Sequence, residues 1–530
     1  MFAIEFRYTL LKANLTEVPM SQKKDKLVSA TLSVTLIILF SKGVGFIREM
    51  IMANYFGRNW ITDAYNSAYS LFYLPILLFS SCITSTLVPL YIKKENALGR
   101  EGANKYASNV LNVFLFFSLI VSAVMMLFAP HLVSIVYPGF DGETFALTTH
   151  LSRIMYPALI FFVAGIVLST ILNAQEHYIA AQLTGLPLSF ALIFAAVFLS
   201  DSYGIYAQAW GVFAAGVLQI VILYPTLRKS YRYSLSLKIN DPDFKYLMVL
   251  AVPALLSMAV NELNHMIDRM LASSLNPGDI SAMTYAFKLI TFMIGVLVVP
   301  LTTISFSKMS KEAVKKDNTA IIPHIHRSLS LLLFAILPIV MMAAVCSEDI
   351  IRLAYGRGQF DEESVKITGV VFMFYVVGVP FFGMRDLLNR VFHSLQDTKT
   401  PMIIAAISMA FNIVLNLILR KYMGVNGLAF ATAVAALIGV TLLFLRLSAR
   451  IKNVFTFKFF MENMKIVLAS AAALASSLLI ASLVPQPTNM LSTLLRLFAV
   501  CGASAFVYLV VCIVLRVSAV KGFVSLLKRR

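Results

Sequence analysis

The sequence predicts an all-α polytopic membrane protein with about 14 transmembrane helices, arranged as two pseudo-symmetric six-helix lobes followed by two C-terminal helices. Three observations predict this class: an apolar composition, long apolar runs along the whole chain, and an internal repeat. Of the 530 residues, 59% are hydrophobic and only 13% are charged, a balance that excludes the soluble globular classes.

Apolar runs supply the predicted transmembrane helices. Each run is close to the roughly 20 residues that a helix needs to cross the hydrocarbon core, where every backbone polar group must be hydrogen-bonded within the segment. The runs lack the alternating pattern of a membrane β-barrel. We place the spans at residues 28–54, 62–92, 106–129, 145–173, 177–200, 206–226, 246–273, 280–308, 325–346, 367–395, 399–419, 427–447, 464–484 and 491–515.

These spans predict the domain organisation. Residues 1–27 form a cytoplasmic N-terminal segment and residues 28–226 form the N-lobe with helices one to six. Residues 227–245 are a cytoplasmic linker to the C-lobe, which covers residues 246–447. Residues 448–530 hold an interfacial segment, helices thirteen and fourteen, and a cytoplasmic tail.

An internal repeat at a constant offset along the chain relates the two predicted lobes. The run IREMIMA at residues 47–53 recurs as IDRMLAS at 267–273, and YGI at 203–205 recurs at the same offset as MGV at 423–425. A repeat unit of six helices is even, so both copies have the same orientation. Repeats of this kind place a substrate near the midplane, between the lobes.

The net charge is +18, and the basic residues that cause it lie mainly on one predicted side of the membrane. Most Lys and Arg residues lie in the N-terminal segment, the even-numbered loops and the tail, so the positive-inside rule predicts that both termini are cytoplasmic. The basic excess is explained by this topology and by attraction to anionic membrane lipids, so no nucleic-acid partner is expected. The basic residues of the odd-numbered loops are only Arg58, Arg352, Arg357, Lys366, Arg420 and Lys421.

Charged side chains interrupt the apolar runs at the start of each lobe. A charge at the bilayer centre costs about 2.5–3.5 kcal/mol, so these residues are expected to face a wet cavity inside the bundle. The stripe in the seventh helix is the densest, and the first, second and eighth helices add to it. The predicted substrate-binding residues are Lys42, Arg48, Glu49, Asp63, Asn261, Glu262, Asn264, His265, Asp268, Arg269 and Lys288.

A structural role is the alternative interpretation of these charges. The set contains four cations and four anions, so complete internal pairing would fix the lobes together without binding anything. A second polar stripe, in the tenth helix, is predicted to form a gate or an ion-pair network at the inner face, with Arg385, Asp386 and Arg390 as its gate residues. His265 has no second His or Cys at metal-ligand spacing, and no metal site is predicted.

The sequence contains no nucleotide-binding or catalytic motif, which indicates a transporter rather than an enzyme. No organic cofactor is expected. Transport would be driven by an ion gradient, the membrane potential or the substrate gradient. A coupling cation, Na⁺ or a proton, would bind Glu49, Asp63, Glu262 or Asp268, and the sequence leaves these four open.

The sequence resembles the MurJ (MviN) family of lipid II flippases, within the multidrug/oligosaccharidyl-lipid/polysaccharide exporter superfamily. The resemblance covers nearly the whole chain after residue 25. Its most specific motifs are YGRGQFD and DTKTP, which favour MurJ-like proteins over drug exporters. The matching segments are SKGVGFIRE at residues 41–49, FG at 56–57, TDAY at 62–65, YGRGQFD at 355–361, DTKTP at 397–401 and GVNGLA at 424–429.

The resemblance implies a cationic cavity between two lobes. Family basic positions correspond to Lys42, Arg48, Arg269 and Lys288, and family acidic positions to Glu49 and Asp63. Helices thirteen and fourteen would line a groove for the polyprenyl tail. The chain departs from the family pattern where a paired arginine is common, at Ile76 and Leu77, and where an acidic residue is usual, at Thr291.

The expected function is translocation of lipid II, a polyprenyl-pyrophosphate-linked peptidoglycan precursor, from the inner to the outer leaflet of the bacterial cytoplasmic membrane by alternating access. The expected partners are this glycolipid and membrane lipids, and the protein is expected to be a monomer. Two transport alternatives stay open: a flippase for another polyprenyl-linked oligosaccharide, and a cation-coupled multidrug antiporter. A non-transporting membrane scaffold is the alternative from another class.

Overall fold

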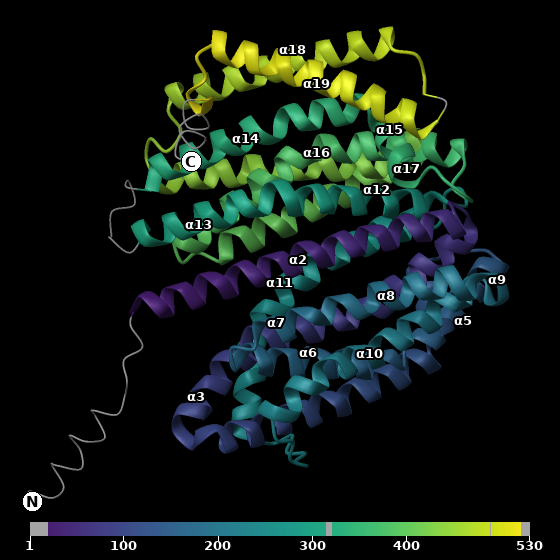
Figure 1. Ribbon diagram of the computed structural model, residues 1–530, viewed down its shortest axis with the longest axis vertical. Coiled ribbons are helices and arrows are strands. Elements are labelled where there is room, and N and C mark those ends of the chain that lie inside the picture. The colour runs from purple at the N-terminus through teal and green to yellow at the C-terminus, as the bar shows by residue number, and fades with distance from the viewer. Residues whose placement is uncertain (1–19, 314–320, 488, 521–530) are drawn as a thin grey trace, which may run out of the picture.

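The computed structural model describes residues 20–313, 321–487 and 489–520, and the regular elements in these ranges are all helices. Figure 1 shows that α2 begins, and α19 ends, on the same side of the helix bundle. The first half of the chain contains α2 (Met20–Phe56), α3 (Trp60–Leu127), α4 (Ala129–Val136), α5 (Gly142–Met155), α6 (Ala158–Ala174), α7 (Tyr178–Gln182), η1 (Leu183–Gly185), α8 (Leu186–Phe194), η2 (Ala195–Leu199), α9 (Ser200–Tyr203) and α10 (Tyr206–Ser230).

The second half of the chain lies beside the first, with α2 running along the boundary between them (Figure 1). The last two helices pack on the outside of the second half, against α14 and α15. These parts contain α11 (Pro242–Ala272), α12 (Asp279–Met293), η3 (Ile294–Val298), α13 (Val299–Ala313), α14 (Ile322–Val345), α15 (Ser347–Tyr355), α16 (Glu362–Ser394), α17 (Lys399–Arg450), α18 (Phe457–Leu483) and α19 (Met490–Val514).

Backbone turns repeat at the offset that the sequence predicts. Gly204 (φ 55°, ψ −140°) and Gly424 (φ 56°, ψ −134°) occupy equivalent positions of the repeat and adopt the same backbone conformation with positive φ. Glu176 (φ 63°) and Gln396 (φ 58°) are a second equivalent pair, and each ends a helix in the αL conformation. The two halves therefore share a backbone plan, which confirms the predicted pseudo-symmetry.

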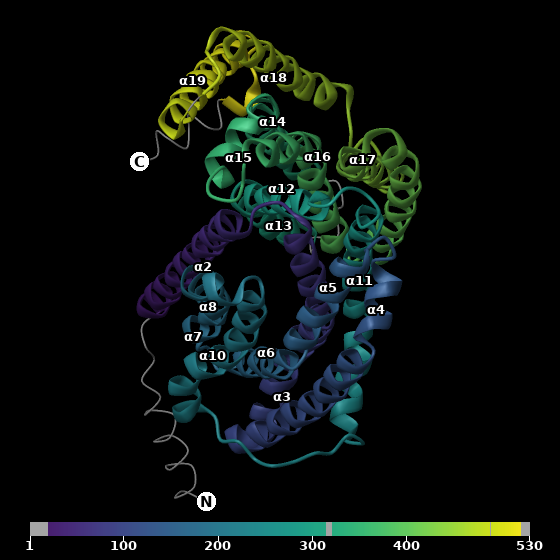
Figure 2. The same cartoon turned by 90° about the vertical axis from the view of Figure 1, so that its right-hand side faces the viewer.

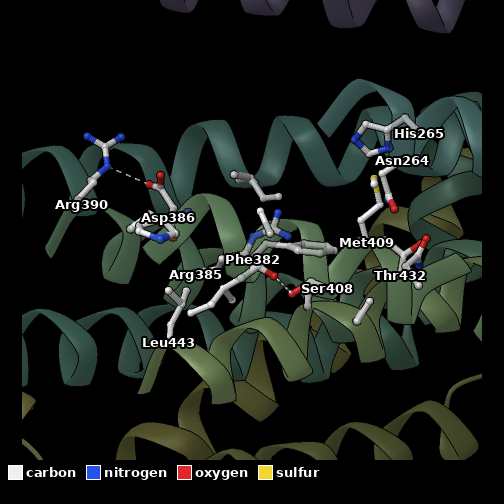
Figure 3. Close-up of a pocket in the computed structure, with 18 of the residues that line it drawn as sticks. Asn264, His265, Phe382, Arg385, Asp386, Arg390, Ser408, Met409, Thr432 and Leu443 are labelled. Carbon is white, nitrogen blue, oxygen red and sulfur yellow. Dashed lines mark hydrogen bonds and ion pairs between the residues drawn. The ribbon is translucent and has the colours of Figure 1, made fainter. Parts of the chain in front are cut away.

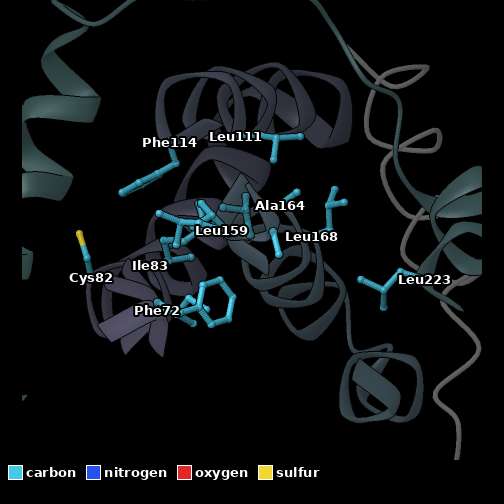
Figure 4. Close-up of a cluster of buried hydrophobic side chains, with 14 of the residues drawn as sticks. Phe72, Cys82, Ile83, Leu111, Phe114, Leu159, Ala164, Leu168 and Leu223 are labelled. Atoms are coloured by element: carbon cyan, nitrogen blue, oxygen red, sulfur yellow. The ribbon is translucent and has the colours of Figure 1, made fainter. Parts of the chain in front are cut away.

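Two large hydrophobic cores correspond to the two halves of the chain. The first is built from α3, α6 and their neighbours, and Figure 4 shows part of it around Phe72, Leu159 and Leu168. The second is built mainly from α12, α14, α16 and α17. Helix α11 belongs to both, because Leu247 is buried in the first core and Leu271 in the second. The α11 helix thus connects the two halves through packing as well as through the chain.

The chain is a polytopic membrane protein. In the described ranges, nine helices are long and apolar enough to cross a membrane, or ten if the bent pair α5 and α6 is one span. Two of these helices are longer than one span: α3 has 68 residues and α17 has 52, and each contains a glycine with positive φ, Gly99 and Gly424. The membrane class of the fold is confirmed, and the count of 14 spans stays a prediction, as do the domain boundaries.

Polar anchors hold α18 and α19 to the second half. Tyr508 of α19 donates a hydrogen bond to the carbonyl of Phe334 in α14 at 2.8 Å. Arg496 is 8% exposed and pairs with Asp349 of α15 at 3.4 Å. Because a buried charge is costly when it is unpaired, Arg496 fixes the position of α19 against α15.

Candidate functional site

Glu49 is the centre of an ion-pair cluster that joins the two halves. It lies in α2 and is 5% exposed. Its carboxylate accepts hydrogen bonds from Arg48 Nη2 at 2.6 Å and Nε at 3.1 Å, and from the ammonium of Lys288 in α12. One carboxylate therefore faces two cations, so the cluster keeps an excess positive charge.

Lys42 adds a further cation to this region. It lies two helical turns before Glu49 on α2. Its ammonium approaches η3, where a Cβ built on Gly295 would lie 2.8 Å from Lys42 Nζ. Among the side chains that the structure describes, no carboxylate forms an ion pair with Lys42. The absence of a side chain at Gly295 leaves room for the ammonium beside α12.

Arg269 reaches from α11 into the first half. It donates a hydrogen bond to Ser70 Oγ in α3, and it is close enough to Lys288 for the two charges to repel. Within the described residues, neither Arg269 nor Glu262 forms an ion pair. Their spacing along the chain puts both on one face of α11 but about 10 Å apart along its axis.

Asp268, the neighbour of Arg269, points into its own half. It is 3% exposed and accepts a hydrogen bond from Asn416 Nδ2 in α17 at 2.6 Å. Asn412 lies beside both, and with its amide oriented to satisfy both ends it donates to Asp268 at 3.1 Å and accepts from the N–H of Thr432 at 3.2 Å. Amide donors therefore occupy Asp268, and it does not neutralise the Glu49 cluster.

Asp63 also lies away from the Glu49 cluster. It is 4% exposed in the first turn of α3 and accepts hydrogen bonds from the backbone N–H of Ser281 at 2.6 Å and from the N–H of Gly278. These N–H groups belong to the N-terminus of α12, which favours a negative charge. Asp63 is thus a clasp between the two halves, at the end of the bundle where α2 turns into α3.

The YGRGQFD motif lies at this same end of the bundle. The N–H of Gln359 donates to the carbonyl of Asn54 in α2 at 2.9 Å. Gly57 has φ +62°, and a Cβ there would lie 2.3 Å from the carbonyl oxygen of Gln359. Arg58 pairs with Asp279 at 3.6 Å. In the sequence this motif marks the family, and in the structure its contacts with α2 and Gly57 close this end of the bundle.

These contacts bear on whether the intramembrane charges cancel. Asp63 and Asp268 are bound by donors elsewhere, and Glu49 is shared by Arg48 and Lys288. Even with Glu262 counted, the boundary between the halves holds more cations than anions. Complete internal pairing, the structural alternative, is therefore not what the described residues form.

A cavity of about 430 Å³ lies inside the second half, between α11, α12, α16 and α17. Figure 3 shows His265 and Asn264 at one end and the Asp386–Arg390 pair at the other, with Arg385 between them. The His265 ring packs on Phe287, with centroids 4.8 Å apart. Asn264 and His265 of the stripe predicted in the seventh helix thus line one cavity with Arg385, Asp386 and Arg390 of the tenth.

The three predicted gate residues differ in their partners. Arg390 Nε pairs with Asp386 at 3.1 Å, four residues earlier on α16. Arg385 packs its guanidinium on the ring of Phe382 at 5.7 Å, and in the described part of the chain it forms no ion pair. An uncompensated arginine that lines a cavity favours an anionic ligand.

The DTKTP motif forms a helix cap at the nearby end of α16. Asp397 accepts a hydrogen bond from the N–H of Thr400 at 3.0 Å, at the start of α17, and pairs with Arg450 at the end of α17. The hydrogen bond from the Thr400 N–H is the main cause that holds the pKa of Asp397 below its ordinary value, and Arg450 adds to it. This motif therefore fixes both ends of α17 to the end of α16.

One predicted site residue cannot be placed, and one buried ion pair was not predicted. The side chain of Asn261 lies outside the described residues, so its predicted role stays a prediction. Arg496 and Asp349 form a buried pair that was not predicted from the sequence. The available signal was an arginine in the otherwise apolar run of residues 491–515.

Comparison with known proteins identifies the family. The family model described as lipid II flippase MurJ matches residues 52–499. The chain belongs to the MurJ family. A probable lipid II flippase MurJ of Rhizobium meliloti (strain 1021) is 31% identical over 417 residues, which cover 77% of this chain and 78% of that protein. A probable MurJ of Thermotoga maritima is 28% identical and covers 84% of this chain and 89% of its own.

Solved structures agree with the MurJ assignment. One described as lipid II flippase MurJ in an inward closed conformation superposes with a TM-score of 0.77 and 26% identity, covering 91% of this chain and 98% of its own. An inward-facing multidrug resistance MATE transporter superposes with a TM-score of 0.65 at 14% identity, covering 79% of this chain and 98% of its own, and shows a shared fold. The resemblance of the motifs to the MurJ family is thus confirmed.

Proposed function

We propose that this MurJ-family protein is a transporter that moves lipid II from the inner to the outer leaflet of the bacterial cytoplasmic membrane. The observation that carries this proposal is the excess of cations at the boundary between the halves: Lys42, Arg48, Arg269 and Lys288 lie there, and the Glu49 carboxylate pairs with Arg48 and Lys288. Family membership supplies the substrate class, and the cations suit its pyrophosphate.

The pyrophosphate would enter this cluster by exchange with Glu49. Arg48 offers a planar fork of donors and Lys288 a point charge, and both are held ready by Glu49 before substrate arrives. Neutralising the phosphates lowers the free-energy cost of carrying them through a low-dielectric layer. Because Glu49 links α2 to α12, competition for Lys288 would also loosen a bond between the two halves.

Alternating access then requires a change at the Asp63 clasp. The hydrogen bonds from Gly278 and Ser281 to Asp63, with the contact of Gln359 on α2, hold one end of the bundle together. Release of these contacts would let the halves separate at that end. The chemistry needs no covalent step, since only ion pairs and hydrogen bonds exchange.

The cavity in the second half is suited to the head group. Asn264, His265 and Arg385 offer amide, imidazole and guanidinium groups to sugar hydroxyls and peptide carboxylates. Arg385 has no carboxylate partner among the described residues, so it can accept one from the substrate. Asp386 and Arg390 would act as the gate at the open end of this cavity.

Among the four candidate carboxylates, Asp268 is the best suited to a coupling cation. The side chains of Asn416 and Thr432 lie beside the Asp268 carboxylate, and Asn416 Oδ1 is buried without a hydrogen-bond partner in the described part of the chain. Hard oxygen ligands of this kind suit Na⁺, and the carboxylate suits a proton. Glu49, Asp63 and Glu262 are alternatives that the same transport assay distinguishes.

The positive-inside distribution supports a finer topology. We propose that both termini are cytoplasmic, which places the Asp63 clasp at the outer face and the DTKTP cap at the inner face. The protein would act as a monomer, with lipid II and membrane lipids as its partners. No nucleic-acid partner is proposed.

The test measures lipid II exposed at the outer face in cells depleted of the protein and complemented with variants. Arg48→Ala is expected to abolish exposure while the protein remains in the membrane at normal amount. Lys421→Ala, which removes an exposed lysine, is the matched control and should complement fully. Normal exposure with Arg48→Ala would reject the cationic site. Normal exposure in depleted cells, with loss of another polyprenyl-linked glycan, would redirect the substrate.

A further inference from the structure

The connection between α10 and α11 is an extended strap, residues 231–239, that lies along α3. Figure 2 shows this connection running past α3 at the edge of the molecule. Asn109 Oδ1 accepts the N–H of Lys238 at 2.6 Å, and Asn109 Nδ2 donates to the Lys238 carbonyl at 3.2 Å. Asn112 Nδ2 donates to the carbonyl of Ser236 at 2.8 Å. Side chains of α3 therefore pair with the strap backbone as a neighbouring strand would.

The position of these asparagines gives the depth of the strap. The third predicted span starts at residue 106, so Asn109 and Asn112 lie about 5 and 9 Å beyond its start, at 1.5 Å per residue. Interfacial segments bury their apolar faces to about 5–10 Å in the headgroup and acyl boundary. From this predicted span boundary, we expect the strap backbone to lie where water is scarce and a backbone needs protein partners.

The strap presents apolar side chains outward. Alternate residues of an extended chain point to opposite sides. Ser234 faces α3, where its N–H donates to Ser108 Oγ at 3.1 Å. Leu235 is 89% exposed and Leu237 is 53% exposed, while Tyr233, which is 55% exposed, turns its hydroxyl back to α3 and donates to Asn112 Oδ1 at 2.9 Å. At the depth expected for the strap, Leu235 and Leu237 would meet lipid rather than water.

Basic residues surround the strap without acidic partners. Arg228, Lys229, Arg232, Lys238 and Lys245 are exposed and form no ion pair with any carboxylate among the described residues. Three acidic side chains lie near the strap: Asp243 binds Lys94, Glu101 binds Lys105 at 3.0 Å, and Asp241 caps α11 by accepting the N–H of Asp243 at 2.8 Å. The surface therefore carries a local excess of positive charge beside an apolar stripe.

We propose that the strap is a binding surface for anionic phospholipids of the leaflet at the α10–α11 end, with Leu235 and Leu237 in the acyl boundary. The headgroups contact Arg232 and Lys238. Binding fixes the connection between the two halves to the first half, in addition to the hydrogen bonds from Asn109 and Asn112. This inference does not depend on lipid II being the transported substrate.

The test places a fluorescent reporter in the strap of the full-length protein. Leu235→Trp is made in a background with Trp60→Phe and Trp210→Phe, which removes both native tryptophans. The protein is reconstituted in vesicles that contain phospholipids brominated near the top of the acyl chain. We expect strong quenching by the brominated lipid and weak quenching by aqueous acrylamide.

Leu98→Trp in the same background is the matched control. Leu98 is 63% exposed in the turn of α3 beside Gly99, before the third predicted span, so its reporter should show the opposite quenching pattern. Leu237→Trp repeats the measurement at a second strap position, in case the first variant does not fold. Acrylamide quenching at both strap positions equal to that at residue 98 would overturn the proposal.

A second arm tests the headgroup. Brominated phosphatidylglycerol is expected to quench the reporter at residue 235 at least twofold more than brominated phosphatidylcholine at equal mole fraction. Arg232→Gln with Lys238→Gln should remove this difference and leave the depth unchanged. Equal quenching by the two lipids in the parent protein would show an apolar contact without anion recognition, and would overturn the headgroup assignment.

Discussion

The two halves of the chain have one backbone plan and two different interiors. Equivalent positions of the repeat hold Arg385 and Gly165, His265 and Gly45, and Asn412 and Leu192. In the second half these positions place polar side chains in the wall of a cavity of about 430 Å³. In the first half Gly165 packs against the side chain of Gln219, and Leu192 is buried in the apolar core. The two halves thus share the same arrangement of helices. Different residues at equivalent positions give only the second half the polar side chains of a candidate binding site.

The charged pairs at the start of each half also occupy equivalent positions but differ in residue type. Arg48 and Glu49 occupy the positions equivalent to Asp268 and Arg269, so the order of charge is reversed. In both copies the second residue crosses to the other half: Glu49 binds Lys288, and Arg269 binds Ser70. Position in the repeat decides which half a side chain faces, and residue type decides what it binds there.

Exchanging the charge order in the first half is expected to have the largest effect. The double variant Arg48→Glu with Glu49→Arg would place an arginine against Lys288 and copy the order of the second half. Breaking a buried pair costs about 3–5 kcal/mol, so we expect loss of lipid II exposure and a lower Tm. Glu49→Asp, which keeps the charge order, should retain most activity. Full activity of the exchanged variant would contradict the conclusion that the second residue of each pair, here residue 49, must match its partner in the other half.

Glycine substitutions in the turn before α3 and in the turn before α12 should have unequal effects. At Gly57 a Cβ would lie 2.3 Å from a backbone oxygen of Gln359, whereas at Gly278 the nearest atom, 2.8 Å away, is the flexible end of Arg58. Both positions have positive φ, a strain of about 1–3 kcal/mol for alanine. Gly57→Ala should therefore lower Tm more than Gly278→Ala. In a Gln359→Cys background, Gly57→Ala should also increase labelling of the introduced thiol. Equal effects on both readouts would contradict the assigned close contact.

Removal of the buried carboxylate in the second half should have a smaller effect. Asp268→Ala leaves the amide of Asn416 buried without its acceptor, which costs about 1–3 kcal/mol of unfolding free energy. Asp268→Ala with Asn416→Ala should cost less than the sum of the two single changes, since the pair acts together. Additive effects in a thermal unfolding cycle would show that the two residues do not depend on each other.

The smallest expected effect concerns Asp397, whose equivalent in the first half is His177. Because hydrogen bonding from Thr400 lowers the pKa of Asp397 in the folded protein, its carboxylate stabilises the fold at neutral pH. This stabilisation is lost as pH falls through the lowered pKa. Asp397→Asn should cost up to about 1 kcal/mol at pH 7 and little in acid below that pKa. Unfolding of both proteins across this pH range measures the difference, and a constant difference would contradict the assignment.

Much of the fold was readable from residue types and their spacing. Apolar length predicted helices, and the constant offset of the repeat predicted two copies that share turns at Gly204 and Gly424. The candidate residues were found because charge in a lipid-spanning run must face protein or water. Their partners were not readable, because Glu262 and Arg269 share a helix face without meeting, and Asp63 binds N–H groups of α12 that lie 215 and 218 residues away in the chain.

The sequence by itself determined that this protein crosses a membrane in repeated helices and that it keeps charges where lipid does not tolerate them. Only the tertiary structure decided which charges cancel: Glu49 is shared by Arg48 and Lys288, while Asp63 and Asp268 are bound by donors elsewhere. The physical reason is that hydropathy depends on the residue alone, whereas the free energy of a buried charge depends on the atoms within a few ångströms of it, and the packing of distant helices supplies those atoms.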